Sequence, residues 1–343
     1  MKKKQNITFS DIAKYTNFSK TTISRYFNNP DSLTLENQKI IADALEKLNY
    51  KENKVARILA NGQTEFIGII IPNLSMHYYS KMLDQILLTY ETYGYKFLVF
   101  IGNEHEETER RYIQELLAYK IEGLIVLSHT IPSSELAALQ LPIVAIERED
   151  SFVSSVNTDN YAGALEAIKL LEEHQCDIMV HINSPTLKTI PAYGRIKGFL
   201  DYCQSHNLPH ELFIREFSTN FEECQKDLED ILNTIDKKYI GKRKGIFISN
   251  DTHANIFLNL LIQKFKKLPD DYYLIGFDNS PISQQAVIPI STIGQHIDKI
   301  AGEAMNILVS QMENQKKRVP LPMNEPVHKV ITPILLKRQT TEK

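Results

Sequence analysis

Short apolar runs alternate with longer amphipathic segments along most of the chain after residue 64. Short apolar runs predict buried strands, and apolar residues that recur every three or four positions predict helices. The predicted strands are residues 66–71, 96–101, 123–127, 143–146, 177–182, 245–249 and 272–277. The predicted helices are residues 77–93, 106–119, 160–173, 193–206, 221–234, 252–266 and 297–313. This alternation predicts an α/β fold with parallel, doubly wound sheets, and two sheets are needed because the pattern restarts near residue 160.

The residues before this alternation predict helices without strands between them. Thr8 is a predicted N-cap, and Ile12 and Ala13 give the first helix a short apolar stripe. Asn17 and Phe18 form the predicted turn to a second helix. A third helix is predicted over residues 32–50, where the apolar positions are Ile40, Ile41, Ala44, Leu45 and Leu48.

The second predicted helix has a distinctive outer face. Ser19 can cap this helix, and Ile23 and Phe27 turn inward. The outward residues are Lys20, Thr21, Thr22, Ser24, Arg25 and Asn28. Two short helices joined by a tight turn, the second with small polar and basic side chains, are typical of a helix-turn-helix whose recognition helix enters the major groove of DNA. The same outline also occurs as a packing unit in helical proteins, so the pattern by itself leaves that alternative open.

The distribution of charge also separates the helical first segment from the rest of the chain. Residues 1–62 carry eleven Lys and Arg against six Asp and Glu, a net charge of +5. The whole chain has 39 basic and 42 acidic side chains, so the remainder holds 28 and 36, a net charge of −8. A basic first segment suits contact with phosphates, and an acidic remainder suits a part that stays away from them.

The composition disfavours membrane and secreted proteins. No apolar run approaches the length of a membrane span. The basic residues 2–4 are followed by Gln5 and Asn6, where a signal peptide would become apolar. The three cysteines are an odd number without CxxC spacing, which predicts reduced, structural thiols rather than disulfides or a zinc site; they are Cys176, Cys203 and Cys224. We therefore expect a cytoplasmic protein.

Signatures of catalysis are missing as well. The sequence contains no GxxxxGK[ST] loop, no GxSxG elbow and no HExxH motif. The glycines and lysines of residues 241–245 precede a strand rather than a helix, so they lack the helix dipole that a phosphate loop uses. His105 and His129 are isolated and are expected to be exposed loop residues. We expect neither an enzyme nor a bound cofactor or metal.

A series of short motifs follows the helix-turn-helix in a fixed order. The third helix ends in Leu-Asn-Tyr (48–50), and after it come a Lys-Val-Ala-Arg-x-Leu-Ala segment (54–60) and a strand that ends in Ile-Pro-Asn (71–73). Later motifs are Asp159-Asn160 with Gly163, Arg195-x-x-Gly198-Phe199, Ser249-Asn250-Asp251, Ile275-Gly276-Phe277-Asp278 and Ser291-Thr292-Ile293-x-Gln295. In this order the motifs resemble the lactose-repressor (LacI/GalR) family of bacterial transcription regulators. The resemblance covers essentially the whole chain. Residues 169–176 and 290–301 faintly resemble the sucrose- and ribose-repressor type.

The resemblance implies a domain organisation. It gives a helix-turn-helix domain over residues 1–52, a hinge helix within 53–64, and an effector-binding and dimerisation domain over 65–343. This last domain would have two periplasmic-binding-protein-like lobes, joined by crossings near residues 161, 291 and 325. Lobe 1 is expected over about 65–161 and 292–325, and lobe 2 over about 162–291 and 326–343. Doubly wound folds bind ligands at the carboxyl ends of their strands, so an effector is expected between the lobes.

The helix-turn-helix reading assigns DNA contacts to single residues. Lys20 and Thr21 are expected to face base edges, with Arg25 close by. The residues expected to position the helix on phosphates are Thr8, Ser19, Thr22 and Asn28. Leu59, in the short helical pattern of residues 53–61, is expected to wedge into the minor groove.

The family's effector contacts match a second set of positions. They are Tyr78, Tyr79, Ser128, Glu147, Arg195, Phe221, Asn250, Asp278 and Gln295. Carboxylates, amides and guanidinium groups bind sugar hydroxyls, and aromatic rings pack on C–H faces, so the resemblance implies a sugar or sugar phosphate. The alternative for Tyr78 and Tyr79 is that they are core aromatics of their helix, and Asp251 is expected to be the N-cap of helix 252–266.

These observations predict a ligand-responsive transcriptional regulator. It would repress a carbohydrate-utilisation operon by binding a palindromic operator as a homodimer, because one helix-turn-helix reads half a site. The tail after Thr332 is too short for a leucine-heptad tetramer helix. Two alternatives stay open: a regulator controlled by a protein corepressor, and a cytosolic sugar-binding receptor without a DNA function.

Overall fold

The chain divides into two compact units in a computed structural model, Met1–Gln63 and Thr64–Lys343. We call them the head and the body. The structure describes residues 7–51, 62–319 and 325–342. Leu59 and the rest of the predicted hinge pattern, residues 53–61, lie outside the described residues.

The head is the predicted set of three helices. They are α1 (Phe9–Thr16), α2 (Lys20–Asn28) and α3 (Leu35–Lys47), with the short 3₁₀ helix η1 (Pro30–Ser32) between the last two. Asn17 ends α1 in the left-handed conformation (φ 56°), which makes the predicted turn. Ile12, Ile23 and Ile41 are fully buried together and join the three helices. Ile40 was expected to face this core but is 41% exposed, because Ile41 and Ala44 form the buried stripe of α3.

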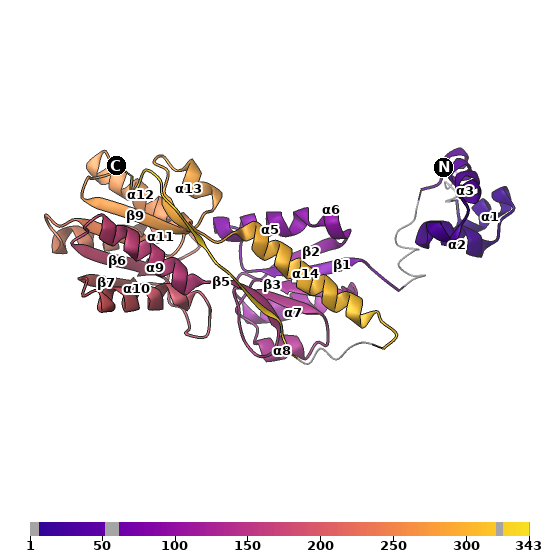
Figure 1. Ribbon diagram of the computed structural model, residues 1–343, viewed down its shortest axis with the longest axis horizontal. Coiled ribbons are helices and arrows are strands. Elements are labelled where there is room, and N and C mark those ends of the chain that lie inside the picture. Colours follow the sequence, from indigo (N-terminus) through magenta and orange to yellow (C-terminus); the bar gives the residue numbers. More distant parts are fainter. Residues whose placement is uncertain (1–6, 52–61, 320–324, 343) are drawn as a thin grey trace. The chain divides into compact units, whose positions relative to one another are not determined.

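The body consists of two lobes, each built on a six-stranded sheet (Figure 1). The sheet of lobe 1 has the order β11-β5-β4-β3-β1-β2, and that of lobe 2 has the order β12-β10-β9-β8-β6-β7. Lobe 1 contains β1 (Phe66–Ile71), β2 (Lys96–Ile101), β3 (Gly123–Val126), β4 (Ile143–Ile146), β5 (Ser154–Thr158) and β11 (His328–Ile331). Lobe 2 contains β6 (Ile178–Asn183), β7 (His210–Ile214), β8 (Lys244–Ile248), β9 (Tyr272–Asp278), β10 (Ser291–Gly294) and β12 (Ile334–Leu336).

Helices cover the sheets. In lobe 1 these are α5 (His77–Leu88), α6 (Tyr90–Tyr93), α7 (Glu106–Ala118), α8 (Ser133–Ala137) and α14 (Ile297–Gln315). In lobe 2 they are α9 (Asn160–Glu173), α10 (Tyr193–Ser205), α11 (Phe221–Lys238), α12 (Asp251–Phe265) and α13 (Pro281–Gln285). The described strand pairs are parallel except β10 with β12, and each sheet packs apolar clusters on both faces. The predicted α/β class with two doubly wound lobes is confirmed.

Three crossings join the lobes within the described residues. The chain passes from β5 to α9, from β10 to α14 and from β11 to β12, and the last passage runs along both lobes in Figure 1. The sequence placed the last crossing near residue 325, which was wrong. His328 pairs with Ser155, so β11 belongs to lobe 1 and the crossing follows Ile331. Likewise β10 pairs with β9, so lobe 2 extends to Gly294.

Two further predictions concern membrane spans and the cysteines. None of the helices in the described ranges has both the length and the apolar character that a membrane span needs. Cys176, Cys203 and Cys224 are buried free thiols, as predicted.

Candidate functional site

Helix α2 presents four exposed side chains of the predicted recognition face. Lys20, Thr21, Arg25 and Asn28 are exposed, whereas Ile23 is fully buried. This arrangement follows from the helical period, since residues 20, 21 and 25 lie away from the position that contacts α1 and α3. The helix therefore carries two positive charges and a hydroxyl outward.

The other predicted DNA contacts form hydrogen bonds at helix ends. Ser19 caps α2, because its Oγ accepts a bond from the Thr22 N–H at 3.1 Å and lies 2.8 Å from the Thr22 hydroxyl. The N–H and hydroxyl of Thr8 donate to an Asp11 carboxylate oxygen at 2.9 and 2.7 Å, which lowers the pKa of Asp11. Asn28 donates from Nδ2 to Ser24 Oγ at 3.1 Å. These side chains fix the ends of α1 and α2.

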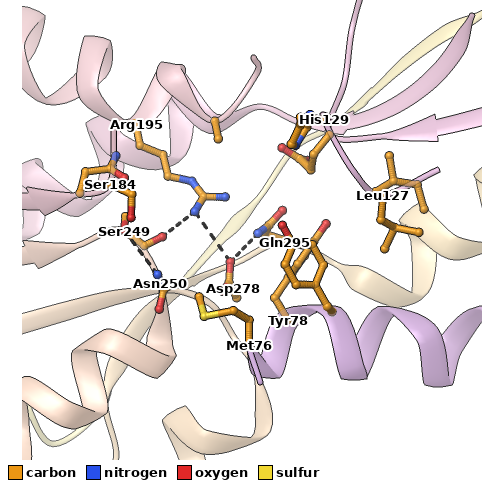
Figure 2. A pocket seen from close by; sticks show the side chains of 15 residues that line it. Met76, Tyr78, Leu127, His129, Ser184, Arg195, Ser249, Asn250, Asp278 and Gln295 are labelled. Atoms are coloured by element: carbon orange, nitrogen blue, oxygen red, sulfur yellow. Dashed lines mark hydrogen bonds and ion pairs between the residues drawn. The ribbon is translucent and has the colours of Figure 1, made fainter. Parts of the chain in front are cut away.

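The body contains a pocket between its lobes, with a volume of about 170 Å³ (Figure 2). It lies where β3, β4, β6, β8, β9 and β10 end and where α5 and α10 begin, as expected for doubly wound sheets. Seven of the nine predicted effector contacts line it: Tyr78, Tyr79, Glu147, Arg195, Asn250, Asp278 and Gln295. Eight lining residues were not in the predicted set: Met76, Leu127, His129, Ile146, Asn183, Ser184, Ala192 and Ser249.

The remaining two predicted contacts do not line the pocket. Ser128 is buried, and its hydroxyl donates to Glu109 at 2.6 Å. Phe221 is 62% exposed at the first turn of α11. The signal for the unpredicted Asn183, Ser184 and Ser249 was present, since all three stand where a predicted strand ends.

A ring of polar side chains connects the strand ends on the two lobes. The Thr158 N–H donates to Glu147 Oε1 at 2.6 Å, and the Thr158 hydroxyl donates to Gln295 Oε1 at 2.6 Å. Gln295 in turn donates from Nε2 to Asp278 Oδ1 at 2.5 Å. Because Thr158 ends the last strand before the first crossing and Gln295 begins the second, this half of the ring joins the two lobes.

Asn160 and Arg195 complete the ring. Arg195 Nε donates to Asn160 Oδ1 at 2.8 Å, and Asn160 Nδ2 donates to Glu147 Oε2 at 2.8 Å. Arg195 Nη1 donates to the Ser249 carbonyl oxygen at 2.5 Å and lies 4.0 Å from Asp278 Oδ1. Its guanidinium also stacks 3.8 Å from the centre of the Phe277 ring. Figure 2 shows Arg195, Asp278 and Gln295 pointing toward one another across the pocket.

A second buried carboxylate lies behind Asp278. Asp251 is fully buried and accepts hydrogen bonds from Thr292 Oγ1 at 2.6 Å and from the Ser280 N–H at 2.8 Å. Burial and the Asp278 charge raise the pKa of Asp251, and burial raises the pKa of Asp278 although Arg195 opposes this. Asp251 was expected to cap α12, which was wrong: Asn250 is the cap, since its side chain accepts from the His253 N–H at 2.8 Å.

Both acidic residues that line the pocket have unusual backbone angles. Glu147 has φ 57° and Asp278 has φ 109°, in the region that L-residues rarely adopt. Such strain persists only where surrounding structure enforces it, and it is frequent at ligand sites.

Two polar atoms of the pocket have no hydrogen-bond partner among the described residues. The Tyr78 hydroxyl and His129 Nδ1 are both buried and unpartnered. His129 is thus not the exposed loop residue that the sequence suggested, and burial lowers its pKa to about 4. Burial raises the pKa of the Tyr78 hydroxyl. Both groups are therefore neutral at pH 7, and each has hydrogen-bonding capacity that the described residues do not use.

The comparisons with known proteins agree with this architecture. Residues 8–53 match the family model described as bacterial regulatory proteins, lacI family. Residues 64–235, half of the chain, match the model for periplasmic binding proteins and the sugar binding domain of the LacI family, and residues 168–341 match a periplasmic binding protein-like domain. The chain therefore belongs to the LacI family of bacterial regulatory proteins.

Individual relatives extend over nearly the whole chain. The ribose operon repressor of Halalkalibacterium halodurans is 29% identical over 312 residues, which cover 90% of this chain and 91% of the relative. The sucrose operon repressor of Streptococcus mutans is 27% identical over 307 residues, covering 89% and 93%. The Lac repressor dimer bound to operator and the anti-inducer ONPF superposes with a TM-score of 0.80 over 98% of this chain and 99% of that one, at 19% identity. This last likeness establishes the shared fold.

Proposed function

We propose that this protein is a repressor of a carbohydrate-utilisation operon that binds a palindromic operator as a dimer and releases it when a sugar or sugar phosphate occupies the body pocket. It acts in the cytoplasm, by binding rather than by catalysis. The observation that carries the proposal is the inter-lobe pocket, whose lining combines Tyr78 and His129, each with an unpartnered polar atom, with two carboxylates and a guanidinium. Buried polar groups without partners are rare, and a polyhydroxylated ligand would satisfy them.

In the head, the proposal gives α2 the role of reading bases. Lys20 and Thr21 contact base edges, with Arg25 beside them, because these side chains are exposed on one helix. The positioning contacts to phosphates come from Thr8, Ser19, Thr22 and Asn28. Leu59 would insert in the minor groove, although it lies outside the described residues. A single helix-turn-helix reads half a site, so the palindrome requires two copies of the chain.

In the body, the proposal makes the ligand a link between lobes. Tyr79 and Glu147 belong to lobe 1, whereas Arg195 and Asp278 belong to lobe 2, and all four line the same pocket. A ligand that contacts both lobes selects the lobe arrangement in which those contacts form together. The proposed effector contacts are Tyr78, Tyr79, Glu147, Arg195, Asn250, Asp278 and Gln295.

Selection of DNA from a random duplex library by the full-length protein tests the proposal. We expect a pseudo-palindromic sequence to be enriched, a dimer in solution by mass measurement, and a sugar that weakens binding to the selected duplex. Asp278→Ala should abolish the response to the sugar and keep sugar-free affinity within about threefold, because uncoupled sites behave independently. A library without an enriched sequence would exclude the repressor, and a stable tetramer would exclude the dimer.

A further inference from the structure

The pocket has too little free positive charge for an anionic ligand. We infer that the effector is an uncharged, polyhydroxylated molecule of about monosaccharide size, and that the pocket discriminates against its phosphate ester. This inference rests on the proposed function and narrows its ligand, for which sugar and sugar phosphate were both considered.

The lining residues carry one cation against two carboxylates. Arg195 is the cation, Glu147 and Asp278 are the carboxylates, and no lysine lines the pocket. His129 adds no charge at neutral pH because its imidazole is held neutral by burial and by Arg148. With both acids ionised, the pocket has a net charge of −1. With Asp278 protonated, the net charge is zero.

The guanidinium of Arg195 is already engaged by the protein. Nε is bound to Asn160, and Nη1 is bound to the Ser249 carbonyl and faces Asp278, so that among the described residues only Nη2 has no hydrogen-bond partner. The planar face is stacked on Phe277. A phosphate is held best by a bidentate guanidinium with two parallel N–H groups. Either parallel pair that Arg195 can present includes Nε or Nη1, nitrogens that already bind Asn160 and Ser249.

A second cavity, lined in part by residues close in sequence to the pocket residue Met76, also offers a phosphate no lysine or arginine. This cavity of about 510 Å³ is lined by residues of both lobes, among them Asn103, Glu104, His105 and Thr219. The Glu104 carboxylate also acts on Tyr79, since it contributes to the raised pKa of the Tyr79 hydroxyl. This side of the pocket therefore adds a negative charge and no cation.

The cost of burying charge favours a neutral ligand whether Asp278 is ionised or protonated. A phosphate monoester carries a charge of about −1.5 to −2 at pH 7. Burying an ion without a partner costs several kcal/mol, and like charges within a few ångströms add to this cost. A hydroxyl instead finds both donors and acceptors here, since the lining includes Asn183, Asn250 and Gln295 besides the two acids.

The volume points to the same class. The pocket has a volume of about 170 Å³. Drug-sized ligands use pockets of about 300–1,000 Å³. A small ligand such as a single sugar ring therefore suits this space.

Matched pairs of ligands test the inference on the full-length protein. Isothermal titration would compare D-ribose with D-ribose 5-phosphate, D-fructose with D-fructose 6-phosphate, and D-glucose with D-glucose 6-phosphate. We expect the neutral member of any pair that binds to do so at least tenfold more tightly. Its affinity should change less than about twofold between low and high salt, because Debye screening acts on charged ligands.

A variant that adds a cation provides a gain-of-function test. Ser184 lines the pocket and is partly exposed, so a longer side chain there can reach the rim without displacing the core. Ser184→Lys should improve binding of the phosphate ester by about tenfold or more, and Ser184→Met, of similar length without charge, should not. If both variants bind the ester as weakly as the native protein, charge is not the cause of the discrimination.

The outcomes separate this inference from the proposed function. Tighter binding of a phosphate ester than of its neutral sugar, abolished by Asp278→Ala, would overturn the inference and leave the repressor with a phosphorylated effector. Binding of neither member in any pair would count against the inference and against a sugar effector. Tighter binding of the neutral sugar, lost in Asp278→Ala, would support both.

Discussion

Asn160 provides a quantitative test of the polar ring. Its side chain makes three hydrogen bonds, to Glu147 Oε2 at 2.8 Å, to the Thr158 carbonyl oxygen at 3.1 Å and from Arg195 Nε at 2.8 Å. Asn160→Ala removes all three and leaves a carboxylate and a guanidinium, each exposed by less than a tenth, without their common partner.

The expected loss follows from those groups. Leaving a buried polar group unsatisfied costs about 1–3 kcal/mol, and more for a charged one. Two charged groups would give about 2–6 kcal/mol, but both face the pocket, where water can enter, so the lower half of this range applies. The gain in helix propensity at the first turn of α9 is at most about 0.7 kcal/mol. Subtracting this gain, we expect Asn160→Ala to lower the free energy of unfolding of the body by about 1.5–3.5 kcal/mol.

Urea unfolding followed by circular dichroism measures this loss, since the chain has no tryptophan. The variant should also bind the effector at least tenfold more weakly, because Arg195 loses the bond that orients it. Asn157→Ala is the matched control: Asn157 is 1% exposed, but it donates to Glu149 and Ser155, outside the ring. This control should lose about 1 kcal/mol and keep its ligand affinity. A loss below about 0.5 kcal/mol for Asn160→Ala, or equal weakening of ligand binding by both variants, would refute the role of the ring.

Three more changes probe other parts of the molecule. Arg25→Ala should cost about 1–3 kcal/mol on the selected duplex and less on unrelated DNA in anisotropy titrations at fixed salt, whereas equal weakening on both would make Arg25 a phosphate contact. Gly276→Ala places a Cβ 2.3 Å from Asp251 Oδ1 and should destabilise the body by about 1–3 kcal/mol in urea, while Gly302→Ala, with open space around it, should not. The raised pKa values of Asp251 and Asp278 mean that the folded state binds more protons than the unfolded state above pH 3.8, so their contribution to stability should fall as pH rises from about 4 toward neutrality. Urea midpoints that fall equally in the native protein and in Asp251→Asn would show that Asp251 does not contribute to the trend.

The strands that the sequence predicted are those with apolar runs. β1, β2 and β4 occupy the predicted residues. β1 and β4 are buried strands, which contain little besides Ile, Val, Leu and Phe, and the half-buried edge strand β2 has a similar apolar run after Lys96. β5 was missed because it buries Ser154, Ser155, Asn157 and Thr158 instead. Ser154 Oγ accepts bonds from the Gln311 amide at 2.8 Å and the Val327 N–H at 3.0 Å, partners that lie more than 150 residues away. No local pattern could indicate such a strand.

In the pocket too, the residues that the sequence predicted are those at the ends of apolar strands, whereas contacts between distant segments could not be predicted. Glu147 and Asp278 stand where apolar strands end, so the sequence could place them at one edge of a sheet. Ser128 has an equivalent position, but its hydroxyl turns to Glu109 on a neighbouring helix, which only the packing determines. Asn160 touches both Glu147 and Arg195, which come from elements of different lobes. The role of Asn160 could not be predicted from the sequence, because it depends on contacts that form only when the ring is assembled.

The final crossing has a consequence for the order in which this chain can be completed on the ribosome. β11 is the edge strand next to β5, and β12 is the edge strand next to β10, so each sheet receives a strand from the last segment of the chain. Ser155 and its hydrogen-bond partner His328 are 173 residues apart. At about 5–20 residues per second, β5 therefore waits about 9–35 s for its neighbour after it is synthesised. During that interval lobe 1 exposes the unpaired edge of β5, and edges of this kind are where nascent chains associate with one another.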